Sequence, residues 1–93
     1  MFFDYWVYNY GDTEAKNIRV RCDLIEEDYE TKRVSVVDYY GNLASNSEGF
    51  GEVVTKMPIV RYGEEFVGLC YVESCDNCEI LYKRIPALIE SYK

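Results

Sequence analysis

The fold is decided by one stretch of the sequence, Val7-x-Asn9-x-Gly11-x-x-x-Ala15-x-Asn17-Ile18-x-Val20. It consists of an apolar run, a turn with Gly and Asp, and a second segment in which apolar and polar residues alternate. A period of two residues is typical of a β-strand with one wet face. The stretch therefore predicts a β-hairpin that opens an antiparallel sandwich. In its second strand, one face carries Ile18, Val20, Cys22 and Leu24, and the other carries Arg19, Arg21 and Asp23.

Turn residues divide the rest of the chain into further short segments of strand character. Ten Tyr, four Phe and one Trp favour pleated sheets over helices, so the class is all-β. With 93 residues the chain has room for one core, which predicts a single domain over residues 1–93. Residues 40–49 read as a long connection, and the tail 86–93 fits either one helical turn or an irregular cover strand. The predicted strands cover residues 2–10, 17–25, 33–39, 50–57, 66–74 and 79–84.

Net charge and the absence of long apolar runs exclude two kinds of partner. The formal charge of −7 would repel the phosphate backbone of DNA or RNA, so no nucleic-acid binding is expected. The uncharged stretches are too short to span a bilayer, and the first residues lack the basic flank and apolar run of a signal peptide. We therefore expect no membrane insertion of this segment. Because the chain starts almost directly in a strand, we expect it to be a domain of a longer, anchored protein.

Two motifs carry a resemblance to a known family. The first is the opening pattern V-x-N-x-G-x-x-x-A-x-N-I-x-V, which an acidic turn at 26–30 follows, and the second is Leu43-Ala44-Ser45-Asn46-Ser47-x-x-Phe50. Together they resemble the FxLYD and CARDB-type immunoglobulin-like domains of bacterial and archaeal surface proteins, over about the first half of the chain. The F-x-L-Y-D string itself is absent, and the four cysteines have no strict counterpart. The resemblance implies an immunoglobulin-like antiparallel sandwich of six or seven strands, acting as a binding or spacer module without catalytic residues.

The four cysteines form two candidate pairs. Cys22 lies on the inward face of its predicted strand and Cys70 near the middle of the fifth, positions similar to the inter-sheet disulfide of an antibody domain. Two buried free thiols explain this pair equally well. Cys75-x-x-Cys78 brackets a β-turn, where a thioredoxin-like site would need a helix N-terminus. A metal knuckle would need further thiolates or imidazoles, so a local disulfide or two exposed thiols is the favoured interpretation.

The sequence lacks the residues that catalytic and metal sites usually require. The chain has no His, which removes Ser/His and Cys/His nucleophile pairs, and it has no phosphate-binding Gly loop. Its 17 acidic residues fall mostly in loops and on wet strand faces, so we expect no enzyme activity, no cofactor and no metal site. The loops 26–30 and 61–65 would share an acidic pole with both termini, where ordinary solvation is favoured over weak calcium binding.

One candidate binding surface lies at the opposite pole, where the turns 11–16, 39–48 and 75–78 would gather. Its predicted contacts are Tyr39, Tyr40, Asn42 and Asn46, because Tyr offers amphipathic area at low entropic cost and Asn adapts its hydrogen bonds. A loop folded over the sandwich edge, with both tyrosines half-buried, is the alternative.

A second candidate surface is the outward face of the first strand, with Trp6, Tyr8 and Tyr10. The hairpin register would place Trp6 opposite Arg21 and Tyr8 opposite Arg19, so that each cation covers a ring. Alternatively the C-terminal tail covers the stripe. If neither occurs, an exposed Trp/Tyr stripe indicates a protein or glycan interface.

Two functions remain after these exclusions. The first is a noncatalytic extracellular or cell-surface module that binds a protein partner or a neighbouring domain of the same parent chain. The second is a small cytoplasmic thiol protein that uses Cys75 and Cys78 for redox or metal binding.

Overall fold

The computed structural model describes residues 1–56, 58–59 and 61–79, and these form five strands. No helix occurs in this part of the chain, which confirms the all-β prediction. Of the predicted strand 79–84 only Glu79 is described, outside any strand, and the tail 86–93 also lies outside the described residues. The strands are β1 (Phe2–Asn9), β2 (Ala15–Glu26), β3 (Lys32–Leu43), β4 (Ser47–Val54) and β5 (Phe66–Ser74).

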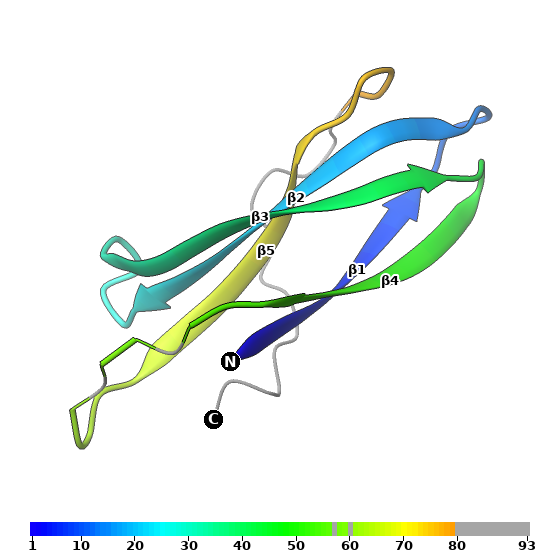
Figure 1. Ribbon diagram of the computed structural model, residues 1–93. Coiled ribbons are helices and arrows are strands. Elements are labelled where there is room, and N and C mark those ends of the chain that lie inside the picture. The colour runs from blue at the N-terminus through cyan, green and yellow to red at the C-terminus, as the bar shows by residue number, and fades with distance from the viewer. Residues whose placement is uncertain (57, 60, 80–93) are drawn as a thin grey trace.

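The five strands form two antiparallel sheets. One sheet pairs β1 with β4, and the other has the order β3-β2-β5. Figure 1 shows the β1–β4 pair at the lower right, beside the layer that β2, β3 and β5 form. Each sheet has an apolar face, and packing the two faces together removes both from water. The protein is therefore built from two antiparallel layers around one core.

The predicted β1–β2 hairpin is wrong. In the described part of the chain β1 bonds to β4, while β2 bonds to β3 and β5, so the loop at 10–14 crosses from one layer to the other. Both strands carry an apolar face, and these faces meet across the core rather than lying side by side. The period of two was interpreted correctly for each strand, but it does not say which strands pair.

The core lies between β1 and β2. Phe3, Tyr5 and Val7 of β1 are at most 4% exposed. They pack in one cluster with Ile18, Val20, Cys22 and Leu24 of β2, the four side chains that the alternation places inward. Ala15, Leu43 and Cys70 complete the buried set.

Two glycines of β4 make room for aromatic rings in this core. A Cβ built on Gly51 would lie 2.3 Å from the Tyr5 ring, and a Cβ on Gly49 would overlap the Tyr40 hydroxyl. Tyr5 is the register partner of Gly51, so its ring lies across the strand where no side chain stands. Tyr5 and Tyr40 meet edge to face, with ring centroids 6.3 Å apart. The inward face of β4 is thus filled by side chains of β1 and β3.

The outward face of β2 is less wet than its sequence predicts. Asp23 is fully buried, with its carboxylate accepting a hydrogen bond of 2.6 Å from the Ser35 hydroxyl and lying 3.5 Å from the Lys32 ammonium. Ile25 is buried as well, and so is Leu69, the register partner of Asp23 on β5, although neither belongs to the core cluster. A hydrogen bond and a cation make the burial of the Asp23 carboxylate tolerable.

The turns at 10–14, 44–46 and 75–78 meet at one pole, as the alternating course of the strands predicts. The side-chain NH₂ group of Asn9 donates to the carbonyls of Thr13, Leu43 and Ala44, and its side-chain oxygen accepts from the backbone N–H of Gly11. The turn at 75–78 is connected to this pole by the backbone N–H of Asp76, which donates to the Lys16 carbonyl. The predicted long connection at 40–49 is wrong, because β3 runs to Leu43 and β4 begins at Ser47.

Candidate binding surface

The outward side chains of β1 and β4 form a continuous surface, which we call the outer β1–β4 face. Its centre is an edge-to-face pair of Trp6 and Phe50, with ring centroids 5.2 Å apart. Trp6 is 56% exposed and Phe50 50% exposed, although both are large apolar residues. The face comprises Phe2, Asp4, Trp6 and Tyr8 of β1 with Glu48, Phe50, Glu52 and Val54 of β4.

Apolar and acidic rungs alternate along this face. The register pairs Phe2 with Val54, Asp4 with Glu52, Trp6 with Phe50, and Tyr8 with Glu48. Desolvation raises the pKa of Glu52, and the neighbouring Asp4 carboxyl raises it further through a side-chain hydrogen bond and through the repulsion of like charges. Within the described residues, no ion pair engages Asp4, Glu48 or Glu52. The face is therefore aromatic and acidic, and the described residues place no cation against its carboxylates.

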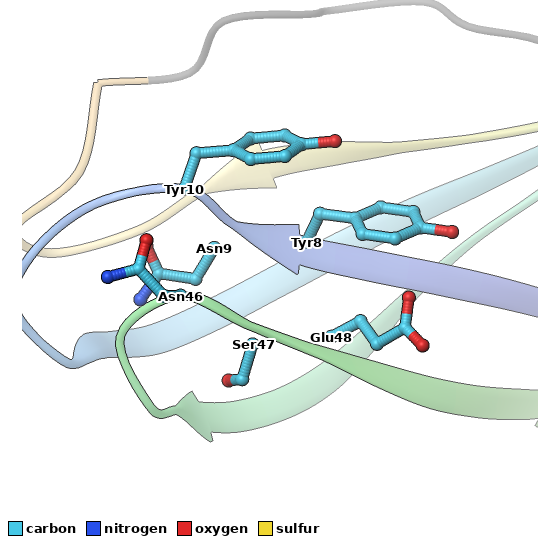
Figure 2. A pocket seen from close by; sticks show the side chains of 6 residues that line it. All are labelled: Tyr8, Asn9, Tyr10, Asn46, Ser47 and Glu48. Carbon is cyan, nitrogen blue, oxygen red and sulfur yellow. The ribbon is translucent and has the colours of Figure 1, made fainter.

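A shallow hollow of about 270 Å³ lies at the end of the face nearest Asn9, at the pole where the three turns meet. Figure 2 shows the parallel rings of Tyr8 and Tyr10 above it and the Glu48 side chain on the far side of Tyr8 from Tyr10. The side chains of Asn9 and Ser47 donate hydrogen bonds to backbone carbonyls of the turns. In the described chain, no hydrogen bond engages the side chains of Tyr8, Tyr10, Asn46 or Glu48. The hollow is lined by Tyr8, Asn9, Tyr10, Asn46, Ser47 and Glu48.

Three of the six predicted binding residues lie on or beside this surface. Tyr8 and Asn46, predicted for two separate surfaces, line the same hollow, and Trp6 lies two residues before Tyr8 on the same side of β1. The predicted pairing of Trp6 and Tyr8 with arginines is wrong, because β1 and β2 belong to different sheets. Arg19 instead lies over the Tyr39 ring, 5.5 Å from its centroid, and Arg21 binds Glu73.

The other three predicted residues lie elsewhere. The Tyr39 hydroxyl donates to the Asn17 side chain at 2.7 Å, and the Asn42 side chain accepts from the Asn17 amide at 3.1 Å. Tyr40 packs against the core beneath Gly49. Tyr39 and Asn42 thus support the bend around Asn17, which has a φ of +54°, and Tyr40 fills the interior.

Besides Phe2 and Asp4 of β1, four residues of the face were missed from the sequence, all of them on β4: Glu48, Phe50, Glu52 and Val54. Their signal is the alternation Glu48-x-Phe50-x-Glu52-x-Val54 with glycines between, which is a strand pattern of period two. Assigning residues 40–49 to a connection hid its first part. The pairing of β4 with β1 joins residues 38 to 52 positions apart, so it leaves no local sequence signal.

The cysteines are joined as Cys22–Cys70 and Cys75–Cys78, which leaves no free thiol. The comparison with an inter-sheet disulfide is wrong, because Cys22 and Cys70 are register partners on the neighbouring strands β2 and β5. Their Cα atoms are 4.1 Å apart, within the close spacing of a directly opposed antiparallel pair. Cys75 and Cys78 flank the turn that follows β5. Asp76 and Asn77 in this turn each donate one hydrogen bond to a backbone carbonyl of residues 14 and 16, and each accepts one from residues 16 and 17.

The acidic loops at the other pole use several of their charges internally. Asp28 accepts bonds from the Glu30 and Thr31 amides and from the Thr31 hydroxyl, which lowers the pKa of its carboxyl. Glu64 binds Arg33 at 3.2 Å. Across the described residues, no three His, Cys, Asp or Glu side chains are grouped so that they could hold a metal ion. The same part of the chain contains no helix long and apolar enough to cross a membrane.

Comparison with known proteins adds no relative. No protein-family model, no curated protein and no solved structure matches this chain at a significant level. Any function assigned to it therefore has to be argued from its own residues.

Proposed function

We propose that this chain is a noncatalytic binding module of a cell-surface protein, and that it recognises a protein partner through the outer β1–β4 face. The observation that carries the proposal is the exposure of Trp6, Tyr8 and Phe50 together on one side of a two-stranded sheet. The inward side of the same sheet already supplies core residues, so the outward rings are not needed for folding. Exposed aromatic clusters of this kind are enriched in protein interfaces, where Trp and Tyr are the commonest binding hot spots.

The strand order supports an immunoglobulin-like sandwich of six or seven strands. In such domains strand B pairs with E in one sheet, and C lies between C′ and F in the other. The five strands β1 to β5 match B, C, C′, E and F in both order and pairing. Strand G would follow β5, where the sequence predicts a strand over residues 79–84. This arrangement agrees with the resemblance to FxLYD and CARDB-type domains, apart from the position of the Cys22–Cys70 bond.

The two disulfides support an extracellular location. Disulfides persist in oxidising compartments and are rare in the cytosol, where thiols are kept reduced. Cys22–Cys70 is buried within the core, while Cys78 is exposed at the surface of its turn. The alternative function, a cytoplasmic thiol protein, requires Cys75 and Cys78 in the reduced form.

Alkylation of the unreduced protein separates these two functions. The protein is taken from the cells that make it, treated with iodoacetamide without reductant, and weighed by mass spectrometry. We expect no adduct, because all four cysteines are bonded. Adducts on Cys75 and Cys78, or bound zinc, would favour the thiol protein. Prior reduction is the control, and it should yield four adducts.

Surface variants test the binding role. The double variant Trp6→Ser/Phe50→Ser removes the aromatic pair, and Val37→Ser, on the exposed side of β3, is the control that removes an exposed apolar side chain from the other sheet. Each immobilised variant is exposed to surface-protein extracts of the same cells. A protein retained by the wild type and by the β3 variant, but not by the Trp6/Phe50 variant, supports the proposal. Equal retention by all three chains argues against this face.

A further inference from the structure

We propose that the partner of the outer β1–β4 face is a basic segment, which lies extended along the strands and places Lys or Arg side chains over its acidic rungs. The inference rests on the proposed function, because it names the chemistry of the protein that this face binds. It is carried by the distribution of charge, by the spacing of the rungs and by the exposure of the rings between them.

The charges of the molecule are segregated between its two sheets. On the three-stranded sheet, the Arg21 guanidinium binds Glu73, and Arg33 binds Glu64 while lying over the Phe66 ring. Arg19 lies over Tyr39. On the outer β1–β4 face, Asp4, Glu48 and Glu52 have no such cation among the described residues. Among the described residues, these three arginines of the three-stranded sheet are thus held by a carboxylate or a ring, whereas the outer β1–β4 face presents carboxylates with no paired cation.

The Asp4–Glu52 rung is the strongest anchor for a cation. The two residues are register partners, and like charges directly opposite each other repel. One oxygen of Asp4 is buried and, within the described residues, accepts no hydrogen bond. A Lys or Arg side chain over this rung would bind both carboxylates in charge-assisted hydrogen bonds, a geometry that suits a guanidinium especially well. The adjacent rings of Phe2 and Trp6 would cover its aliphatic stem or face its charge.

The rungs define a spacing for the partner. Same-face residues of a strand recur about every 7 Å, so the Asp4–Glu52 and Tyr8–Glu48 rungs lie about 13 Å apart with Trp6–Phe50 between them. An extended peptide also repeats its same-face side chains about every 7 Å, so every second side chain can lie over one rung. The matching pattern is basic-x-apolar-x-basic, with the apolar side chain on the aromatic pair and the second basic side chain beside Glu48 and the Tyr8 ring.

Charge argues against two other occupants. A second copy of the chain docked face to face would bring two sets of Asp4, Glu48 and Glu52 together, in molecules that each carry a formal charge of −7. Nucleic acid would meet the same repulsion. A basic segment is the occupant whose charge fits the face.

Fluorescence of Trp6 reports binding directly, because it is the chain's one tryptophan and lies at the centre of the face. The probe is the blocked peptide Thr-Lys-Thr-Val-Thr-Lys-Thr, which contains no tryptophan. Two matched peptides carry Gln or Glu in place of both lysines. We expect the lysine peptide to shift the Trp6 emission saturably and to bind more weakly as salt rises, while the Glu peptide has no effect.

Charge variants of the intact chain locate the contacts. Glu52→Gln and Glu48→Gln should each lower the affinity for the lysine peptide about two- to fivefold, as expected for an exposed ion pair. Glu27→Gln, in the turn after β2 at the other pole, is the matched control and should leave the affinity unchanged. Circular dichroism of each variant shows whether the fold is retained.

The outcomes separate the inference from the function on which it rests. Equal binding of the Gln and Lys peptides, or no response to the Lys peptide at millimolar concentration, overturns the basic partner but leaves protein recognition intact. A Trp6 shift with cellohexaose and not with any peptide overturns both. Concentration-dependent dimers in sedimentation that disappear in Trp6→Ser/Phe50→Ser would make a second copy the occupant, and would also overturn the inference.

Discussion

Tyr5 is the residue that ties the two layers together. Its ring stands on β1 across from Gly51, and its hydroxyl donates a 2.5 Å hydrogen bond to Asp38 of β3. Burial raises the pKa of the Tyr5 phenol, and the Asp38 carboxylate raises it further, because a phenolate there would be both desolvated and next to a negative charge. The neutral phenol is therefore the form that the fold requires.

The titration of Tyr5 predicts a loss of stability at high pH. A pKa raised above the unfolded value of about 10 gives a contribution that is complete below pH 10 and declines as pH rises toward the folded pKa. We expect the wild type to lose stability above pH 10 more steeply than Tyr5→Phe, by at most about 1.4 kcal/mol per pH unit. Urea unfolding at pH 7, 9, 10 and 11 measures this difference.

Tyr5→Phe should also have a lower free energy of unfolding than the wild type at neutral pH. Removing the hydroxyl leaves Asp38 without this donor, which costs about 1–3 kcal/mol for a hydrogen bond to a charged group. Tyr8→Phe is the control, because the Tyr8 hydroxyl is exposed and, in the described chain, has no hydrogen-bond partner. Identical pH profiles for the wild type and Tyr5→Phe would contradict the assignment.

Single residues differ in how far the sequence predicts them. The inward positions of Ile18, Val20, Cys22 and Leu24 follow from the alternation and are confirmed by their burial. Asp23 was expected on the wet face and is buried, because its partners Ser35 and Lys32 come from the next strand and only the tertiary structure brings them close. Local pattern fixes which way a side chain points, but not what covers it.

At the scale of the elements, β4 shows how one strand serves both the core and the surface. Its inward positions include Gly49 and Gly51, which admit the rings of Tyr40 and Tyr5. Its outward positions carry Glu48, Phe50 and Glu52. The glycines allow large rings from other strands into a thin layer, while the outward side chains remain available for binding.

Adding one methyl group at Gly51 should therefore destabilise the protein. In a strand interior Gly→Ala ordinarily stabilises by about 0.5–1 kcal/mol, because glycine loses more conformational entropy on folding. At Gly51 the new Cβ would meet the Tyr5 ring at 2.3 Å, and overpacking of this kind costs about 1–3 kcal/mol. We expect Gly51→Ala to lower the free energy of unfolding in urea titrations.

A second substitution distinguishes this clash from an intrinsic effect of alanine in β4. In the background Tyr5→Leu, which lacks the ring, Gly51→Ala should be neutral or stabilising. An equal loss in both backgrounds would show that the ring is not the obstacle. Glu52→Ala, an outward change next to it, should leave the core packing unaffected.

Strand positions were predictable from the sequence and strand pairings were not. Four of the predicted strands overlap β1, β2, β3 and β4, and the fifth, residues 66–74, coincides with β5. The hairpin was wrong because the turn residues at 11–14 fit a crossing between layers as well as a tight turn. Hydrogen bonds between β1 and β4 depend on packing of side chains across the whole core, which no window of sequence contains.

At the scale of the whole molecule, the two disulfides should differ in their effect on stability. Cys22–Cys70 closes a loop with a sequence separation of 48 residues, and Cys75–Cys78 closes one of 3. The chain-entropy model assigns the larger loop about 4 kcal/mol and the smaller about 2 kcal/mol. We expect Cys22→Ala/Cys70→Ala to lower the free energy of unfolding about twice as much as Cys75→Ser/Cys78→Ser. Urea titrations without reductant measure both, and a larger loss from the Cys75/Cys78 variant would contradict the model.

The candidate surface was foreseen from the sequence only in part. Trp6 and Tyr8 were predicted because alternation places them opposite the core side chains of the same strand. The carboxylates that give the face its charge come from β4, and they became its neighbours only through the β1–β4 pairing. A binding surface made of two distant segments is a property of the fold rather than of either segment.

The Cys22–Cys70 crosslink also determines how the module would respond to tension. A pull on the two chain ends cannot lengthen the segment between the crosslinked residues, which would otherwise extend to about 160 Å. That segment includes β4 but not β1, so a pull on the N-terminal side can detach β1 from β4 while the crosslinked segment stays closed. Such a load would separate Trp6 from Phe50 and release any bound partner without extending the crosslinked segment.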